Sequence, residues 1–483
     1  MSAWSPETGS LDFSTLRARY AGGSLTPVEV ARAALARIAR GDEKAWISRV
    51  PEEDVLRRAG ELEALAARQG MERALAELPL FGLPFAVKDN IDVAGLPTTA
   101  ACPAFAYAPS KSAPAAGRIL EAGAVLLGKT NLDQFATGLV GVRSPHGAPR
   151  NPFDARYIPG GSSSGSAVAV SAGLASFALG TDTAGSGRVP AGFTNIVGLK
   201  PTRGLVSASG VVPACRSLDC VSVFALTAPD ALGVLRVMAA EDPEDPYSRP
   251  APGGWPFPAE PLDGLRVGVP RANELEFFGD GEAERLFSSG LARLAELGPR
   301  LAEADFRPFR ETADLLYGGP WMAERLAAVG EFMDKNPEAL HPVTRRLIEG
   351  GRRYTAADAF RAMYRLEALR KEAARGWEGM DLLAVPTSGT IYTIAQVEAD
   401  PIDLNNNLGR YTNFVNLLDL AAIAMPNALD ARGLPAGITL VAPAFREGLL
   451  CALGDAFHRA TGLCLGAGGN PVPPASGNPP GFS

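Results

Sequence analysis

The sequence predicts an α/β protein with a mixed central β-sheet. Short apolar segments of strand length alternate with longer helical segments along most of the chain. This alternation is typical of a sheet whose strands are joined by helices. The composition, with 46% apolar and 20% charged residues, is that of a globular protein. At 483 residues the chain is also long enough to bury a large core.

Composition and charge narrow the possible functions. The net charge of −7 argues against binding to nucleic acid or to an anionic membrane. The sequence contains no apolar run of 18 residues, and its first residues, MSAWSPETGS, do not resemble a signal peptide. We therefore expect no membrane span and a cytoplasmic location. Five scattered cysteines without a CxxC pair, and only three histidines, predict reduced thiols, no metal site and no other cofactor.

The first part of the chain is predicted to be helical. Thr26, with Glu29 three residues later, forms a capping box, which predicts a helix that runs to about Arg40. Alanine-rich sequence predicts further helix over residues 51–76. We expect these helices to cover the core.

A predicted buried strand over residues 80–87 ends in Lys88. The charge of a lysine in this position is costly to desolvate, so the side chain needs a partner or a lowered pKa. One interpretation is an ion pair with Asp89, Asp92 or another carboxylate. The other is an uncharged lysine that serves as a general base.

The later elements are predicted from the same alternation of apolar and helical segments. In chain order we expect a turn at 95–99, a helix at 113–122, a strand at 124–128, a short helix at 129–135, a glycine-rich loop at 138–151, a tightly packed helix at 165–173, a strand at 177–179, a proline-rich surface connection at 243–261, a strand at 265–269, a mostly helical section at 281–376, strands at 381–386, 421–426 and 437–441, and a closing helix at 446–460.

Glycine and serine are concentrated between residues 156 and 203. Two glycines precede the serines of Ser162–Ser164, and the strand at 177–179 leads into GTDTAGSG at 180–187. Sequence so poor in side chains leaves backbone N–H groups accessible and lets a ligand approach closely. A hydroxyl within such a run, just after a strand, suits a serine nucleophile beside an oxyanion hole.

Ser186 is the predicted nucleophile of this stretch. Ser162 precedes it with a helix and a strand between them, so the two loops can meet, and Lys88 at its strand end can join them. A serine, a bridging serine and an uncharged lysine form a proton relay that needs no histidine. The predicted oxyanion hole consists of the backbone N–H groups of Thr183, Ala184, Gly185 and Ser186.

Other motifs compete for the same stretch. Residues 161–165, GSSSG, satisfy the G-x-S-x-G nucleophile elbow centred on Ser163, which requires a late histidine such as His341 or His458. The elbow also needs a strand directly before it, and YIP at 157–159 is short and contains proline. A phosphate-binding loop or a non-catalytic anion-binding module would use the same glycines, although neither common nucleotide-binding glycine motif follows a strand here.

These segments resemble the amidase signature family. The resemblance rests on VKDN at 87–90, GGSSSGS at 160–166, GTDTAGSGR at 180–188 and GLKPT at 198–202, and it runs from about residue 20 to residue 460. It implies the amidase-signature fold, in which helices cover both faces of the mixed sheet. It also implies three regions: an N-terminal helical region at 1–75 that packs on the core or on a dimer partner, an amidase signature domain at 76–462, and a flexible Gly/Pro-rich tail at 463–483.

The same resemblance implies roles for individual residues. Ser186 would be the nucleophile, Ser162 the bridging serine that follows a cis peptide bond, and Lys88 the base. Asp182 and Arg188 would support the loop that carries the nucleophile. These assignments agree with the relay derived above from the residues alone.

Within the family, the sequence is similar to the allophanate hydrolase subgroup. The similar segments are AGSGR at 184–188, LYGGPWMAER at 316–325 and LGRYTNFVNLLDL at 408–420. The resemblance implies hydrolysis of allophanate, a small planar anion, to ammonia and N-carboxycarbamate. It further implies a homodimer and a functional link to a urea carboxylase or to enzymes of cyanuric acid breakdown. The alternatives within the family are a general amidase and the glutaminase subunit of a glutamyl-tRNA amidotransferase.

A small carboxylate substrate needs a cation and fixed hydrogen-bond donors. Tyr317 and Arg325, eight positions apart on one predicted helical stretch, would project to the same side, where the arginine can bind a carboxylate with two hydrogen bonds. The resemblance adds Gly138 and Ser163 to the substrate-binding residues. The alternative is structural, with Tyr317 packed in the core and Arg325 paired with Glu324 or a surface acid.

Overall fold

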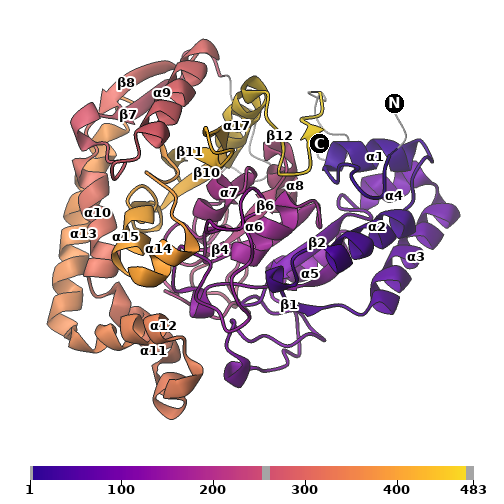
Figure 1. The fold of residues 1–483 in the computed structure, drawn as a ribbon, viewed down its shortest axis with the longest axis horizontal. Helices are drawn as coiled ribbons and strands as arrows, with labels where there is room; N and C mark the ends of the chain where they lie inside the picture. Colours follow the sequence, from indigo (N-terminus) through magenta and orange to yellow (C-terminus); the bar gives the residue numbers. More distant parts are fainter. Residues whose placement is uncertain (1–3, 253–261, 475–483) are drawn as a thin grey trace.

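The computed structural model of the protein describes residues 4–252 and 262–474 (Figure 1). Its central sheet has 11 strands: β1 (Trp46–Arg49), β2 (Pro84–Lys88), β3 (Val125–Thr130), β4 (Phe177–Asp182), β5 (Val197–Lys200), β6 (Cys220–Ala225), β7 (Arg266–Pro270), β8 (Arg300–Ala304), β9 (Leu382–Pro386), β10 (Leu420–Leu429) and β11 (Pro435–Pro443). Their order in the sheet is β1-β3-β2-β4-β6-β5-β10-β11-β9-β7-β8.

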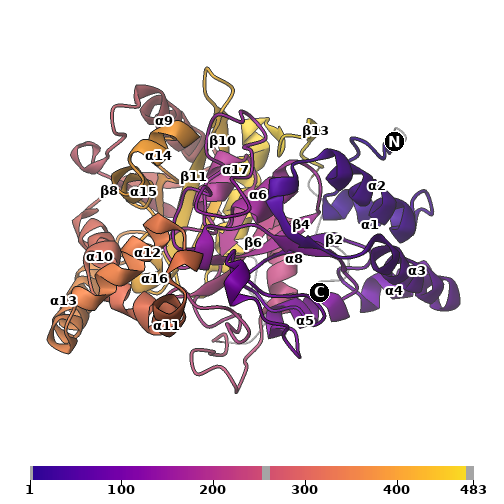
Figure 2. The ribbon, with the colours of Figure 1, turned by 60° about the horizontal axis from the view of Figure 1, so that its bottom comes forward.

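Helices flank this sheet (Figures 1 and 2). They are α1 (Phe13–Ala21), α2 (Pro27–Arg40), α3 (Glu52–Gln69), α4 (Met71–Glu77), α5 (Pro114–Glu121), α6 (Ser164–Ser171), α7 (Val189–Phe193), α8 (Ala228–Met238), α9 (Gly281–Glu296), α10 (Arg307–Gly318), α11 (Trp321–Lys335), α12 (Pro342–Glu349), α13 (Ala356–Gly376), α14 (Ile394–Ala399), α15 (Asp403–Leu408), α16 (Phe414–Leu417) and α17 (Glu447–Thr461). None of the helices in the described part of the chain is long and apolar enough to cross a membrane.

The sheet is mixed, which confirms the predicted fold class. Strand β2 lies between β3 and β4 and is parallel to both, whereas β4, β6, β5, β10, β11 and β9 pair in antiparallel fashion in that order. Because β2 and β4 are parallel neighbours, their last residues, Lys88 and Asp182, lie at the same edge of the sheet. The candidate site is built at this edge.

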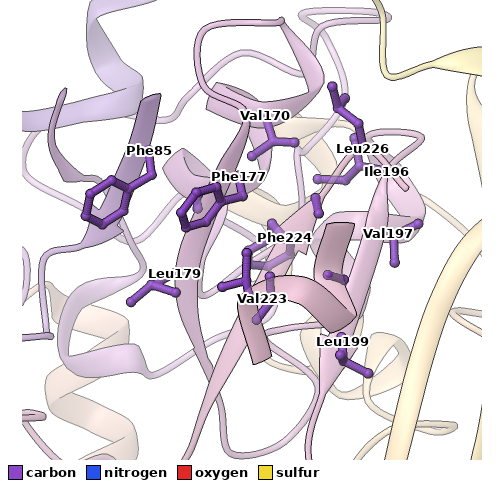
Figure 3. Close-up of a cluster of buried hydrophobic side chains, with 14 of the residues drawn as sticks. Phe85, Val170, Phe177, Leu179, Ile196, Val197, Leu199, Val223, Phe224 and Leu226 are labelled. Atoms are coloured by element: carbon purple, nitrogen blue, oxygen red, sulfur yellow. The ribbon is translucent and has the colours of Figure 1, made fainter. Parts of the chain in front are cut away.

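The core below that edge is formed by β2, β4, β5, β6 and the small-residue helix α6 (Figure 3). Phe85 on β2 and Phe177 on β4 are register partners, and their rings stack with centroids 5.2 Å apart. Helix α6 is buried along its whole length. Its small side chains permit this close approach, since a Cβ atom on Gly165 would lie 2.3 Å from the backbone oxygen of Ala45.

The N-terminal helices pack against the same core. Thr26 forms the predicted capping box with Glu29 at the start of α2. The helix predicted over residues 51–76 is two helices, α3 and α4, because Gly70 between them adopts a φ of +91°. Leu16 of α1 and other apolar side chains of these helices belong to the hydrophobic cluster that contains the strands. Figure 1 shows α1 to α4 gathered at one end of the sheet.

Two predicted elements near the site differ from the structure. The strand predicted over 80–87 begins at Pro84 and includes Lys88. The short helix predicted over 129–135 is wrong, because β3 continues through Thr130, which pairs with Lys88, and only Gln134–Ala136 forms a single 3₁₀ turn. Sheet pairing here outweighs local helical preference.

The section from 281 to 376 is mostly helical as predicted, although β8 interrupts it. The prediction that Tyr317 and Arg325 share one helical stretch is wrong. Helix α10 ends at Gly318 and α11 begins at Trp321. Pro320 lies between them and cannot donate a backbone hydrogen bond, so it ends one helix and starts the next.

Part of the predicted flexible tail has regular structure. The short strands β12 (Cys464–Leu465) and β13 (Asn470–Pro471) pair in antiparallel fashion. The side-chain amide of Asn195 donates to two carbonyl oxygens of this segment, each at 2.9 Å. Residues 475–483 of the tail, and residues 253–261 of the predicted surface connection, lie outside the described residues.

Candidate active site

Lys88, Ser162 and Ser186 meet at the edge where β2 and β4 end. Lys88 Nζ lies 2.8 Å from Ser162 Oγ, and Ser162 Oγ lies 3.0 Å from Ser186 Oγ. Lys88 and Ser162 are fully buried, and Ser186 is 3% exposed. The three predicted relay residues thus form one continuous hydrogen-bonded chain that is shielded from bulk water. Such a chain can carry a proton from a hydroxyl group to an amine.

The ion-pair interpretation of Lys88 is wrong. Its amine donates to Thr181 Oγ1 at 2.7 Å in addition to Ser162. Within the described residues, Lys88 forms no ion pair. Asp89 instead pairs with Lys129, whose Nζ lies 3.3 Å from Asp89 Oδ1. The amine of Lys88 is therefore held by hydroxyl groups, which can hydrogen-bond to its uncharged form.

The pKa of Lys88 is close to neutral. Burial lowers this pKa to about 7, against the opposing effects of the nearby carboxylates of Asp133, Asp219 and Asp182. The guanidinium of Arg325 also lowers it. A substantial fraction of the Lys88 side chain is therefore uncharged at neutral pH, as a general base requires.

The bridging serine is fixed by the backbone on both sides. The peptide bond between Gly161 and Ser162 is cis, as the resemblance implied. Asp133 donates its N–H to Ser162 O at 3.0 Å, and its carboxylate accepts the N–H groups of Val140 and Gly141 at 3.2 and 3.0 Å. A Cβ atom on Gly161 would lie 2.2 Å from Asp133 Oδ2, so only glycine fits there. Asp133 thus anchors the loop that presents Ser162.

Asp182 and Arg188 organise the loop that carries Ser186. Both side chains are fully buried, and they form a bidentate ion pair with distances of 2.9 and 3.0 Å. The same carboxylate accepts the N–H groups of Gly185 and Gly187 at 2.9 and 3.0 Å. Burial alone would raise the pKa of Asp182, but Arg188 outweighs burial and holds that pKa below its usual value. The geometry is that expected of the two predicted supporting residues.

We expect Arg188→Ala to lower the free energy of unfolding by about 3–5 kcal/mol, because it leaves the carboxylate of Asp182 buried and unpaired. Urea denaturation followed by circular dichroism measures this change. Arg156→Ala is the matched control, since Arg156 pairs with Asp154 on the exposed surface. Equal midpoints for the two variants would contradict the expected role of Arg188.

Two residues from the 408–420 region support the outer side of this loop. Arg188 Nη2 donates to Thr412 O at 3.1 Å, and a Cβ atom on Gly185 would lie 2.3 Å from Thr412 Oγ1. Asn416 Nδ2 donates to Asp182 O at 2.8 Å. The segment whose sequence is similar to the allophanate hydrolase subgroup therefore packs directly against the nucleophile loop.

The predicted oxyanion hole needs one correction. The N–H of Gly185 donates to Asp182 Oδ1 at 2.9 Å, so it is not free to bind an oxyanion. In the described part of the chain, the N–H groups of Thr183, Ala184 and Ser186 donate to no protein acceptor. These three groups remain candidates for stabilising negative charge at the substrate carbonyl.

Tyr317 and Arg325 come together although they lie on different helices. The guanidinium carbon of Arg325 is 5.6 Å from the centroid of the Tyr317 ring. Arg325 is 2% exposed, and its Nη1 donates to Thr137 Oγ1 at 3.1 Å and to Ala136 O at 3.4 Å. Its Nη2 has no hydrogen-bond partner among the described residues. A buried guanidinium with free donors can bind an anion.

Arg325 does not pair with Glu324, the structural alternative considered for it. The two carboxylate oxygens of Glu324 accept the backbone N–H and the hydroxyl of Ser217, at 2.7 and 2.8 Å. Arg325 points instead toward the site, close enough to Lys88 to lower its pKa.

The other two predicted substrate-binding residues lie within the same assembly. Ser163 Oγ donates to Thr181 O at 3.1 Å, so its hydroxyl group supports β4. Gly138 adopts a φ of +156°, and a Cβ atom on it would lie 2.6 Å from Asp133 Oδ2. A contact between substrate and Ser163 or Gly138 stays a prediction.

The structure gives no support to a nucleophile elbow at Ser163. The residues before it contain only an isolated β-bridge at Tyr157, not a strand. Ser163 Oγ bonds to a backbone oxygen rather than to a histidine. His458 is buried in α17, where burial lowers its pKa to about 4, and His341 is half-buried at the start of α12. Neither histidine hydrogen-bonds Ser163 in the described residues.

Three residues of the site were not found from the sequence: Thr181, Asp133 and Asp219. Thr181 binds the amine of Lys88, Asp133 anchors Ser162, and the carboxylate of Asp219 faces both Lys88 and Arg325. Thr181 carried a usable signal, because a polar residue near the end of an apolar strand beside a glycine-rich loop is well placed for a site. Asp133 and Asp219 carried none, since they join the site only through the fold.

Comparisons with known proteins agree with this geometry. A family described as Amidase matches residues 29–451. Urea amidolyase of Saccharomyces cerevisiae is 44% identical over 424 residues, which are 86% of this chain and 22% of that protein. The chain thus spans less than a quarter of the length of the urea amidolyases that it matches. A glutamyl-tRNA(Gln) amidotransferase subunit of Symbiobacterium thermophilum is 35% identical over 485 residues, which are 93% of this chain and 97% of that protein.

The fold is also similar to that of solved structures. Allophanate hydrolase of Kluyveromyces lactis superposes with a TM-score of 0.86 at 40% identity, covering 95% of this chain and 74% of that chain. Sequence motifs, sheet topology and the family match over most of the chain all agree. The chain therefore belongs to the Amidase family.

Proposed function

We propose that this chain hydrolyses allophanate to ammonia and N-carboxycarbamate through a relay of two serines and a lysine. The observation that carries this proposal is Arg325, a buried guanidinium with an unpaired Nη2 beside the ring of Tyr317. It lies near enough to Lys88 to affect that residue's pKa. A cation so placed selects a substrate that carries an anionic group close to the amide that is cleaved.

The enclosure of the site supports a small substrate. Ser186 is 3% exposed, so a bulky amide would have to displace protein atoms to reach it. Allophanate is planar and carries a carboxylate next to its terminal amide, which matches one guanidinium facing one nucleophile. We place Tyr317 and Arg325 at the carboxylate, and Gly138 and Ser163 along the same substrate.

In the proposed reaction, Ser186 Oγ attacks the terminal carbonyl carbon of allophanate. Its proton passes through the hydroxyl of Ser162 to the uncharged amine of Lys88, and the negative charge on the carbonyl oxygen is stabilised by the free N–H groups of the loop. The protonated Lys88 then returns a proton through Ser162 to the leaving ammonia. Water next hydrolyses the ester on Ser186 by the reverse relay, which releases N-carboxycarbamate.

The relatives support the same substrate class. Proteins named urea amidolyase and allophanate hydrolase match this chain at 40–44% identity. Because the chain spans only part of urea amidolyase, we propose that a separate urea carboxylase, or an enzyme of cyanuric acid breakdown, supplies the substrate. We also propose that the chain acts as a homodimer in the cytoplasm.

Ammonia release from purified protein tests the proposal. We expect turnover of allophanate and little or no turnover of glutamine or of simple aliphatic amides. The Ser186→Ala variant provides the background rate. Turnover of glutamine but not of allophanate would overturn the proposal.

We expect kcat/KM to rise with pH through about 7 and to level off above it. Burial lowers the pKa of Lys88 to about 7, and only the uncharged amine accepts a proton. Because kcat/KM reports ionisation in the free enzyme, its acid limb follows this group. Initial rates measured between about pH 5.5 and pH 9 check this expectation. A rate that falls as pH rises through 7 would contradict the assignment of Lys88 as base.

The second candidate is the glutaminase subunit of a glutamyl-tRNA amidotransferase. It is favoured by the 35% identity to the amidotransferase subunit of Symbiobacterium thermophilum over nearly the whole of both chains. Since glutamine is larger than allophanate and carries an α-ammonium group, it fits the buried cation Arg325 less well. The same ammonia assay, run on glutamine, decides between the two.

A further inference from the structure

We propose that Asp219 is a positioning residue for amide hydrolysis, and that the loop it closes links the oxyanion-binding N–H groups to the helix that carries Arg325. This inference rests on the proposed reaction at Ser186 and adds a residue outside the relay. The loop in question spans residues 214–219, between the glycine–serine region and β6, and is called the 214–219 loop below.

The carboxylate of Asp219 is held by three donors. Thr183 Oγ1 donates to Asp219 Oδ1 in a short hydrogen bond. The backbone N–H groups of Ala214 and Cys215 donate to the same carboxylate at 2.9 and 3.2 Å. Asp219 is 7% exposed, so these bonds form away from water. A buried carboxylate with this many donors fixes the groups around it in one geometry.

Thr183 connects Asp219 to the nucleophile loop. It is the first residue after β4, and its own N–H is among the free donors predicted to bind the oxyanion. The residue before it, Asp182, already binds Gly185 and Arg188. Two successive residues of the loop are therefore tied to different partners, Asp182 to its own loop and Thr183 to Asp219. The orientation of the peptide groups that follow depends on both ties.

The other end of the 214–219 loop contacts helix α11. Ser217 gives its N–H and its hydroxyl to the two carboxylate oxygens of Glu324, at 2.7 and 2.8 Å. The thiol of Cys215 donates to Trp321 O at 3.5 Å. Glu324 directly precedes Arg325 in the sequence. A continuous set of hydrogen bonds thus runs from Thr183 through the 214–219 loop to the helix that presents the guanidinium.

The charge of Asp219 also acts on the base. Lys88 is faced by the carboxylates of Asp133, Asp182 and Asp219 and by the guanidinium of Arg325. Burial raises the pKa of Asp219 to about 6, so the group is ionised at pH 7 and above. Its negative charge favours the protonated form of Lys88. Removing that charge therefore lowers the pKa of Lys88 further.

Two variants separate the charge of Asp219 from its hydrogen bond to Thr183. Asp219→Asn removes the charge and keeps the shape, whereas Thr183→Val keeps the charge and removes the hydroxyl. The readout is the rate at which a fluorophosphonate labels Ser186, measured by intact mass between about pH 5.5 and pH 9. We expect both variants to lower the plateau rate by roughly tenfold or more, because oxyanion donors are displaced.

The pH profiles distinguish positioning from a merely structural role. In Asp219→Asn the acid limb should move to lower pH, while in Thr183→Val it should stay where it is in the wild type. A plateau rate and an acid limb in Asp219→Asn that both equal those of the wild type would overturn the proposal. If Asp219→Asn does not fold, an unchanged plateau rate in Thr183→Val overturns it instead.

A third variant tests the link to α11. Glu324→Gln weakens the bond to Ser217, so we expect a severalfold rise in KM for allophanate with a smaller change in kcat. No change in KM would refute the link. Since the labelling experiment uses no allophanate, its outcome stands even if allophanate proves not to be the substrate. In that case the wild type fails in the ammonia assay while the shift of the acid limb remains.

Discussion

Replacing Lys88 with methionine is expected to lower kcat for allophanate by about 10²–10⁴-fold, the usual contribution of a general base. The variant removes the amine that lies 2.8 Å from Ser162 Oγ and leaves a side chain of similar length in the buried site. KM should change little, because the amine contacts hydroxyl groups of the protein rather than the substrate. Steady-state ammonia release measures both constants.

Lys111→Ala is the control for this experiment, since Lys111 pairs with Glu244 on the exposed surface. It should keep the kcat of the wild type. Circular dichroism of Lys88→Met should match that of the wild type, because the replacement removes a buried polar group without opening a large cavity. Full activity in folded Lys88→Met would exclude this lysine as the base.

Replacing Arg325 with alanine should raise KM for allophanate by roughly 30- to 4,000-fold. This range corresponds to the loss of about 2–5 kcal/mol when one partner of a buried, hydrogen-bonded charge pair is removed. The effect on kcat should be smaller, because the guanidinium binds the carboxylate and not the reacting carbonyl. Initial rates over a wide range of allophanate concentration measure the two effects separately.

Biuret is a sharp substrate control for Arg325, because it replaces the carboxylate of allophanate with an uncharged amide of similar shape. The wild type should strongly prefer allophanate over biuret, and Arg325→Ala should lose most of that preference. Arg345→Ala, at an exposed position on α12, should behave as the wild type does. A preference for allophanate that survives in Arg325→Ala would mean that another group binds the carboxylate.

The relay residues could be predicted from the sequence because each carries a local signal. Lys88 ends an apolar run, and Ser162 and Ser186 lie in glycine-rich segments on either side of a strand. Parallel pairing of β2 and β4 then brings these segments to one edge of the sheet. The order of the 11 strands could not be predicted, because it depends on contacts between residues far apart in the chain.

The substrate-binding pair shows a different limit. Tyr317 and Arg325 were predicted to meet through helical periodicity, yet they meet because α10 and α11 are separate helices. Gly319 and Pro320 signalled the break and were given too little weight. Asp219 could not have been found, since an aspartate between a loop and a strand is common. Only the fold brings it to Thr183.

Labelling with a fluorophosphonate tests the central claim most directly, because it reports whether an uncharged Lys88 activates Ser186 through Ser162. Peptide mapping should find the adduct on Ser186, and the labelling rate should rise with pH through about 7, where burial places the pKa of Lys88. The adduct should be absent in Ser186→Ala, and labelling should be slow at every pH in Lys88→Met. An adduct on another residue, or a rate in Lys88→Met equal to that of the wild type, would contradict the account.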